Sequence, residues 1–196
     1  LSIDSDLGSR RQLDGQKLSL GHYAGLGGDR HFDCMFWNPK EKFVWTHPDC
    51  IDTGDEGARI YESHVGMAQE AGKVSSYVEY AEHILPRVKE QDNSHLAHGY
   101  LEHAYYGSFG YHVTGFFGIS SRQGTPDDFK FLVNKAHSMG IKIIIDLVHS
   151  HASNNVIDGI NKFDGTDHSF SHAGARGYHS GWDSMVFDYT KYEVKR

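Results

Sequence analysis

The segment after a strongly apolar run carries residues whose types and spacing could perform chemistry. Asp146 ends that run, and His149 and His151 follow within five residues. A carboxylate at the end of a buried strand is costly unless it is paired or hydrogen-bonded, so we expect Asp146 to serve a site. The alternative is that Asp146 caps backbone amides and the histidines are solvated. Because the two histidines are spaced His-x-His near an Asp, a metal-dependent hydrolase that uses His149 and His151 is a further hypothesis.

A second segment, residues 102–117, is rich in aromatic and poor in aliphatic side chains. Tyr111 lies between Gly110 and His112, which suits an exposed ring. Such a ring can stack on the C–H face of a sugar while its hydroxyl keeps a hydrogen-bond partner. The competing interpretation of the neighbouring aromatic residues is ordinary core packing; these residues are Tyr105, Tyr106 and Phe109.

A third polar segment is the long loop predicted over residues 163–183. Loops of this length in compact domains are usually functional or disordered. Trp182 could stack on a sugar or simply anchor the loop, and the sequence favours neither interpretation.

Helix and strand signals place these segments on an α/β framework. Residues 59–66 are predicted to form a short strand. Ser76 and Glu79 have the spacing of a capping box, and Pro86 should end or kink the helix that follows. Residues 92–101 should be the next strand of a βαβ unit, although histidines and a glycine interrupt its apolar pattern.

The next helix and strand have the clearest signals in the chain. Thr125 is a predicted N-cap followed by Pro126, and Gly140 should end the helix in a left-handed conformation. Residues 141–148 form a nearly continuous apolar, β-branched run, typical of a strand buried on both faces of a parallel sheet. The βαβαβ order indicates an α/β fold, either an open doubly wound sheet or a closed eight-fold barrel. In both, ligands bind at the carboxyl ends of the strands.

The composition narrows the classes of partner. The chain has 19 Lys and Arg against 26 Asp and Glu, which gives a formal net charge of −7. Because its basic residues are not clustered, we expect neither a nucleic-acid nor a membrane partner. Two cysteines are too few for a disulfide framework, and this favours a reducing compartment.

The amino-terminal region has weaker signals. Residues 1–30 are rich in Gly, Ser, Asp and Arg and lack periodicity, whereas aromatic residues in 32–46 predict a hairpin with a turn at 38–42. The chain starts with Leu1 rather than Met and ends without a helix stop signal. We therefore expect a chain that begins and ends within a longer protein.

Five collinear segments resemble the eukaryotic-type 1,4-alpha-glucan branching enzymes, which are members of the alpha-amylase superfamily. One such segment would be a weak signal, but five in the same order and at similar spacing are specific. The resemblance covers residues 59–193 and, more loosely, 32–48. The five segments are RIYESHVG, EHAYYGSFGYHVTGFF, SSRQGTPDDFKFLVNKAHSMGI, DLVHSHASNNVIDGINKFDGTD and HAGARGYHSGWDSMVFDY.

The resemblance implies the amino-terminal part of a (β/α)8 TIM barrel, preceded by the remnant of a small β-sandwich glucan-binding domain. Residues 1–50 would hold the poorly defined tail of the sandwich, and residues 51–58 would be a linker. Residues 59–196 would form barrel strands one to three and the loop that follows them.

The resemblance also implies a site and a reaction. Tyr111 would stack on the sugar at the cleavage subsite, His151 would hydrogen-bond the same sugar, and Asp146 would help organise the site. The family cleaves an α-1,4 linkage by double displacement and transfers the chain to a 6-hydroxyl group of glucan, forming an α-1,6 branch. Its nucleophile and acid/base lie beyond the third strand, so no catalytic residue is assigned here. This chain alone is expected to be inactive.

The implied partner is an α-glucan such as amylose, starch or glycogen. We expect no metal or other cofactor, and a cytoplasmic location with a plastid as the alternative. Residues 91–99 depart from the apolar second strand of the family. A second hypothesis is a glucan-binding pseudoenzyme remnant, kept for contact rather than chemistry.

Overall fold

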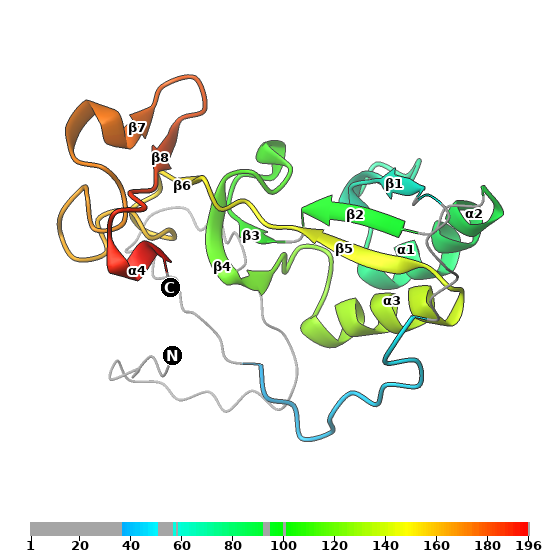
Figure 1. Ribbon diagram of the computed structural model, residues 1–196. Helices are drawn as coiled ribbons and strands as arrows, with labels where there is room; N and C mark the ends of the chain where they lie inside the picture. Colours follow the sequence, from blue (N-terminus) through cyan, green and yellow to red (C-terminus); the bar gives the residue numbers. More distant parts are fainter. Residues whose placement is uncertain (1–36, 51–56, 58, 92–94, 100, 196) are drawn as a thin grey trace.

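Figure 1 presents the protein as a computed structural model. The expectations for residues 1–30, and for the first part of the predicted hairpin, lie outside the residues that the structure describes. The described residues are 37–50, 57, 59–91, 95–99 and 101–195.

The hairpin predicted at 32–46 is wrong in its described part, because residues 37–46 contain no strand. The backbone of this stretch is bonded to a helix side chain instead. Thr46 and His47 donate backbone N–H hydrogen bonds of 3.0 and 2.8 Å to Asn134 Oδ1. The aromatic composition therefore led to a wrong strand prediction for a segment that lies along the outside of a helix.

Three parallel strands form the central sheet, in the order β1 (Ile60–Glu62), β2 (His95–Gly99) and β5 (Lys142–Asp146). The predicted strands are thus confirmed, each shorter than its sequence signal. β2 is the middle strand and pairs with both neighbours, although its sequence is not apolar. Main-chain hydrogen bonding does not depend on side-chain type, so the interrupted pattern of residues 92–101 concealed a regular strand.

Three helices cover one face of this sheet (Figure 1): α1 (Tyr77–His83), α2 (Leu85–Glu90) and α3 (Pro126–Ser138). The capping box at Ser76 is confirmed, and the helical pattern after it breaks at Ile84, two residues before Pro86. Thr125 caps α3, and its side chain accepts from the backbone N–H of Asp128. Gly140 follows α3 with a φ of 73°, the left-handed conformation that was predicted.

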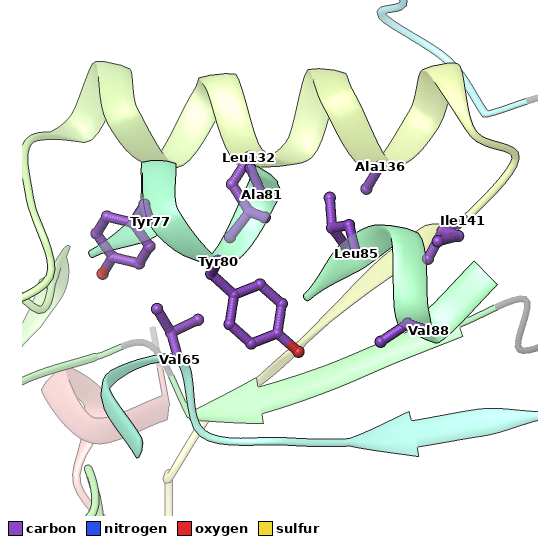
Figure 2. Packing of buried hydrophobic residues seen from close by; sticks show 9 residues of the cluster. All are labelled: Val65, Tyr77, Tyr80, Ala81, Leu85, Val88, Leu132, Ala136 and Ile141. Atoms are coloured by element: carbon purple, nitrogen blue, oxygen red, sulfur yellow. The ribbon is translucent and has the colours of Figure 1, made fainter. Parts of the chain in front are cut away.

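The main hydrophobic core lies between these helices and the sheet (Figure 2). Leu132 and Ala136 enter it from α3, and Tyr80 enters it from α1. Each of its side chains is at most 2% exposed, so the core is fully removed from water. The nine residues are Val65, Tyr77, Tyr80, Ala81, Leu85, Val88, Leu132, Ala136 and Ile141.

The predicted burial of β5 on both faces is wrong for this chain. Ile143 packs against the helix-side core, whereas Ile144 and Ile145 are 38% and 44% exposed. No described layer covers the second face, and no described strand pairs with the outer edge of β5. An apolar run shows that a strand can be buried on both faces. The layer that covers the second face must come from other parts of the fold.

The rest of the chain extends from the carboxyl end of β5 (Figure 1). β3 (Leu101–His103) and β4 (Val113–Ile119) form an antiparallel pair. β6 (His151–Ser153), β8 (Ser184–Val186) and β7 (Tyr178–His179) form a small antiparallel sheet, so the predicted loop at 163–183 also carries a short strand. The remaining short elements are α4 (Tyr192–Lys195) and the 3-10 turns Val65–Met67, Tyr106–Ser108 and Gly174–Gly177.

The helices that the structure describes include none with both the length and the apolar character of a membrane span.

Candidate functional site

The candidate site residues lie where the parallel sheet gives way to the antiparallel strands. Asp146 is the last residue of β5, and His151 is the first residue of β6. Tyr111 precedes β4 and follows a tight turn in which Phe109 and Gly110 have φ values of 54° and 94°. The left-handed region costs glycine little, so Gly110 allows the chain to reverse and present Tyr111 toward the end of β5.

The structure brings Tyr111, Asp146 and His151 together. The Tyr111 hydroxyl donates a long hydrogen bond of 3.5 Å to Asp146 Oδ2. The Tyr111 carbonyl lies 3.0 Å from His151 Nε2, and Ser150 Oγ lies 2.8 Å from His151 Nδ1. A neutral His151 that donates from Nε2 and accepts at Nδ1 fits both contacts. The backbone and the ring of Tyr111 thus link the two other site residues.

Burial and nearby charges favour the neutral forms of His151 and Tyr111, which lie beside the carboxyl group of Asp146. Burial lowers the pKa of His151, an effect that the Tyr111 carbonyl partly opposes and that His112 and His179 reinforce. Burial also raises the pKa of the Tyr111 hydroxyl, and the negative charges of Asp146 and Glu62 raise it further. Near neutral pH the arrangement therefore offers hydrogen-bond donors, a carboxylate acceptor and a half-exposed ring.

A cavity of about 750 Å³ opens beside these residues. Its size is within the range of about 300–1,000 Å³ that is common for small-molecule sites. Tyr111, Asp146 and His151 all line it, together with residues that come from the loop before β8. The full lining is Tyr105, Gly107, Ser108, Tyr111, His112, Asp146, Leu147, Val148, His149, Ser150, His151, Gly181, Trp182 and Asp183.

Trp182 is the residue whose role the sequence left open, and the structure gives it a position at the cavity. Its ring centroid lies 5.1 Å from that of His151 and 4.1 Å from that of His179. Asp183 and Tyr105 also line the cavity, although neither was singled out as a site residue. Both residues lie in segments that resemble the family, which is the signal that could have found them. No spacing rule in the sequence predicts that residues about 80 positions apart line the same cavity.

Part of the aromatic segment packs inward, as the competing interpretation held. Tyr106 lies face to face with His103, with ring centroids 6.4 Å apart. Phe109 contacts the ring of His64 but stays 45% exposed. Tyr105, at 62% exposed, is not a core residue.

The metal-site hypothesis does not fit the donor atoms. His149 is exposed, and its Nδ1 lies 3.0 Å from the Leu147 carbonyl. Both ring nitrogens of His151 already have partners. In the part of the chain that the structure describes, no group of three or more His, Cys, Asp or Glu residues is arranged to hold a metal ion. Asp146, His149 and His151 instead line the cavity.

Comparisons with known proteins agree with this architecture. The family model for the alpha-amylase catalytic domain matches residues 88–175. An alpha-amylase from Lactobacillus plantarum superposes with a TM-score of 0.57 at 24% identity, covering 70% of this chain and 33% of that protein. An alpha-amylase from Geobacillus thermoleovorans complexed with acarbose gives a TM-score of 0.57 at 20% identity, covering 70% and 35%. At such identities the structural likeness defines the fold alone.

Curated sequences give a more specific match. The 1,4-alpha-glucan-branching enzyme of Oryza sativa subsp. japonica, described as chloroplastic/amyloplastic, is 48% identical over 171 residues, which cover 84% of this chain and 21% of that protein. The enzyme of the same name from Dictyostelium discoideum is 48% identical over 166 residues, covering 84% and 24%. That of Felis catus is 46% identical over 171 residues, covering 87% and 24%. The chain thus spans about a fifth to a quarter of the length of these relatives.

The fold and the family model together define part of a (β/α)8 catalytic domain of the alpha-amylase type. Within that class, the sequence identities make the chain a segment of the 1,4-alpha-glucan-branching enzyme family. The predicted family resemblance is therefore confirmed, and so is the choice of the closed barrel over the open doubly wound sheet.

Proposed function

We propose that this chain supplies the sugar-binding floor of a 1,4-alpha-glucan branching enzyme. Tyr111 stacks on one glucose unit of an α-1,4-glucan, His151 and Asp146 hydrogen-bond it, and the complete enzyme transfers the cleaved chain to a 6-hydroxyl group. The observation that carries the proposal is the meeting of these three side chains at one cavity, in a chain 48% identical to curated branching enzymes. Starch, glycogen and amylose are the substrates of this class that we expect.

The domain organisation is part of the proposal. Residues 59–196 are the first part of the barrel, 51–58 a linker, and 1–50 the tail of a β-sandwich glucan-binding domain. Support comes from the parallel order β1, β2, β5, which is that of barrel strands one to three. The hydrogen bonds from the backbone of Thr46 and His47 to Asn134 on α3 also fit a sandwich tail that ends against the first part of the barrel.

Chemistry requires carboxylates beyond those assigned here. Retaining enzymes of this class use two carboxyl groups about 5–5.5 Å apart, one as nucleophile and one as acid and then base. We assign neither role to Asp146, because its place at the end of the third barrel strand fits the organisation of the sugar site. The 196-residue chain should therefore bind glucan and transfer none. We expect the cytoplasm as the compartment, with a plastid as the alternative.

A chimera tests the proposed function. Residues 101–191 of this chain would replace the matching region of the Dictyostelium discoideum branching enzyme, and branching of amylose would be followed by the fall in iodine absorbance. We expect the chimera to branch amylose and its Tyr111→Ala form to lose most of that activity. Tyr111→Phe, which keeps the ring, should retain more activity. A folded chimera without activity, or branching by the 196-residue chain alone, would contradict the proposal.

A further inference from the structure

The turn that carries Tyr111 lies against a group of ring side chains that do not line the cavity. Tyr111 is one of three exposed aromatic rings at the cavity, and the other two belong to Tyr105 and Trp182. The rings beside its turn are buried or half-buried, and they come from the segment after β1, the end of β3 and the 3-10 turn before Tyr111. The proposed function gives them no role. We call this group the imidazole cluster, and its members are His64, His103 and Tyr106.

The imidazole cluster is joined to the turn by ring contacts. The His64 ring meets the rings of Tyr106 and Phe109 edge to face, with centroids 5.8 and 5.6 Å apart. The His103 ring lies nearly parallel to that of Tyr106, with centroids 6.4 Å apart. Phe109 lies two residues before Tyr111, and its φ of 54° belongs to the tight turn. A shift of either imidazole therefore moves the backbone that presents Tyr111.

The Tyr106 ring is packed with little spare room. A Cβ atom at Gly66 would lie 2.6 Å from the Tyr106 hydroxyl oxygen, closer than real contacts allow. The guanidinium carbon of Arg122 lies 5.6 Å from the centroid of the Tyr106 ring. Closely packed interiors have low compressibility and transmit strain. Repulsion inside the imidazole cluster should therefore displace the turn instead of being absorbed locally.

The geometry around His103 fits a neutral ring. His103 is 1% exposed, and its Nδ1 lies 2.9 Å from the Leu101 carbonyl, so Nδ1 carries the single proton of the neutral form. Its Nε2 is buried and has no hydrogen-bond partner among the residues that the structure describes. Protonation of Nε2 would place a charged donor in the interior without a described acceptor, and such burial is costly.

The neighbouring charges add to this cost. Burial lowers the pKa of His103, the hydrogen bond to the Leu101 carbonyl opposes this effect, and the positive charge of Arg122 lowers the pKa again. Burial also lowers the pKa of His64, and His103 lowers it further. Tyr106 stays neutral, because burial raises the pKa of its hydroxyl group. A proton on either imidazole therefore meets positive charge from the other members and from Arg122.

The carboxyl group beside the imidazole cluster is already bonded to the backbone. Glu102 Oε1 accepts from the backbone N–H of His103 at 3.2 Å, and Oε2 accepts from that of Ser121 at 2.8 Å. Burial raises the pKa of Glu102, which favours its uncharged form as the pH falls. From α1, the Tyr80 hydroxyl donates to Ser63 Oγ at 2.8 Å and stays neutral, since its pKa is raised to about 12. Neither group supplies a full counter-charge for an imidazolium ion.

We propose that His64 and His103 are positioning residues that hold the Tyr111 turn in its sugar-binding place only while both imidazoles are uncharged, so that glucan binding weakens in mild acid. The inference rests on the proposed function and adds a control of the same site by pH. In a displaced turn the imidazoles reach water and take up protons near the ordinary pKa of 6.5, whereas in the packed turn they do so at lower pH. The packed turn is therefore fully favoured above pH 6.5 and loses this advantage as the pH falls below that value.

Maltotriose affinity at two pH values tests the proposal. The 196-residue chain would be titrated with maltotriose at pH 8 and at pH 5.5 and followed by NMR. Kd should rise by up to about tenfold at pH 5.5, the limit for one proton taken up over the unit of pH below 6.5. His64→Gln and His103→Gln do not titrate, so each should reduce this rise, and the double variant should reduce it most. His83→Gln, at an exposed position on α1, is the matched control and should leave the rise unchanged.

A second measurement separates the imidazole cluster from His151, whose pKa is also lowered by burial. His151 donates to the Tyr111 carbonyl from Nε2 whether or not Nδ1 is protonated, so its charge does not release the turn. Amide hydrogen exchange of the ligand-free wild type, corrected for the intrinsic effect of pH, should be faster at pH 5.5 in residues 105–112 and unchanged in α3. This comparison needs no substitution, so it decides the matter even where a variant does not fold.

The outcomes distinguish the inference from the proposed function. Equal affinity at pH 8 and pH 5.5, a rise in Kd that persists in the folded double variant, or unchanged exchange in residues 105–112 would overturn the role of the imidazole cluster. The proposed function stands in each of these cases if Tyr111→Ala weakens binding at pH 8. Absence of binding at pH 8, or binding at that pH indifferent to Tyr111→Ala, would overturn the proposed function as well.

Discussion

The helix-covered sheet and the cavity region are built by different physical means. In the first, nine side chains that are at most 2% exposed pack between α1, α2, α3 and the strands. In the second, three aromatic rings that are 48–62% exposed surround a cavity and are held by turns and hydrogen bonds. Apolar burial supplies most of the stability of a domain, so the first region should carry the fold and the second should carry the ligand.

This division assigns separate effects to substitutions in the two regions. Truncation in the sheet region should lower the free energy of unfolding, because it opens a cavity in a packed core. Truncation of an exposed ring at the cavity should change ligand affinity and leave the free energy of unfolding almost unaltered. A single variant that did both would show that the regions are not independent.

The largest effect is expected from Leu132→Ala in α3. Leu132 is 0% exposed, and such truncations cost about 2–5 kcal/mol of unfolding free energy. Phe163→Ala is the control, because its ring is 77% exposed and its loss should stay within about 0.5 kcal/mol. Urea denaturation followed by circular dichroism measures both changes. Equal losses of unfolding free energy in the two variants would contradict the claim that the packed sheet region carries the stability of the fold.

A smaller loss is expected from Thr125→Ala, which removes the α3 cap. The Thr125 side chain accepts from the backbone N–H of Asp128, and caps of this kind contribute about 0.5–2 kcal/mol. Thr125→Ser keeps the hydroxyl and should restore most of the stability. The same urea titration measures both variants, and no difference between Ala and Ser would show that the cap does not stabilise α3.

The pH dependence should reveal the histidine that lies between the two regions. Burial lowers the pKa of His103, on β3, from its ordinary value of 6.5. The unfolded chain then takes up a proton near pH 6.5 that the folded chain does not, so stability falls as the pH drops below that value. Glu79 adds little to this comparison, because its pKa falls from 4.5 to about 2 on folding and the stability it contributes is lost only as the pH falls below about 5.

The contribution of His103 is measured by comparing urea midpoints at pH 8 and pH 5.5 in the wild type and in His103→Gln. Burial also lowers the pKa of His64, and His103 lowers it further, so the variant reports on this pair of histidines. We expect a smaller acid-induced loss in the variant, since the amide does not titrate. Burial raises the pKa of Glu102 and acts in the opposite sense, but Glu102 is present in both proteins and cancels. His149→Gln, at an exposed position, is the matched control. An unchanged acid response in His103→Gln would show that His103 is not a source of acid sensitivity.

The same division explains what could be predicted from the sequence. The caps at Ser76 and Thr125, the break before Pro86 and the turn at Gly140 follow from rules that act within a few residues, and all are present. The exposure of Ile144 and Ile145 does not follow from the apolar run of residues 141–148 itself, because it depends on which layers cover a sheet and not on the strand. Helix caps and turns are determined by a few neighbouring residues, whereas the burial of a strand depends on all the layers packed around the sheet.

The site was predictable only in part for a related reason. Asp146 stood out because it ends an apolar strand, His151 because it follows within five residues, and Tyr111 because it lies between Gly110 and His112; the family resemblance added the roles of the three. Trp182 comes next to His151 through the pairing of β6 with β8, which joins residues about 30 positions apart. No helical or strand periodicity spans such a distance, so the contact of the long loop with the cavity emerges only in three dimensions.

The central claim is that a glucan occupies the cavity beside Tyr111, Asp146 and His151. Hydrogen–deuterium exchange of the 196-residue chain, with and without saturating maltotriose, tests it most directly. The account predicts slower exchange in peptides that cover residues 105–112 and 146–151, and unchanged exchange in α3. Protection confined to α3 or to other segments away from the cavity, with none in those two peptides, would contradict it.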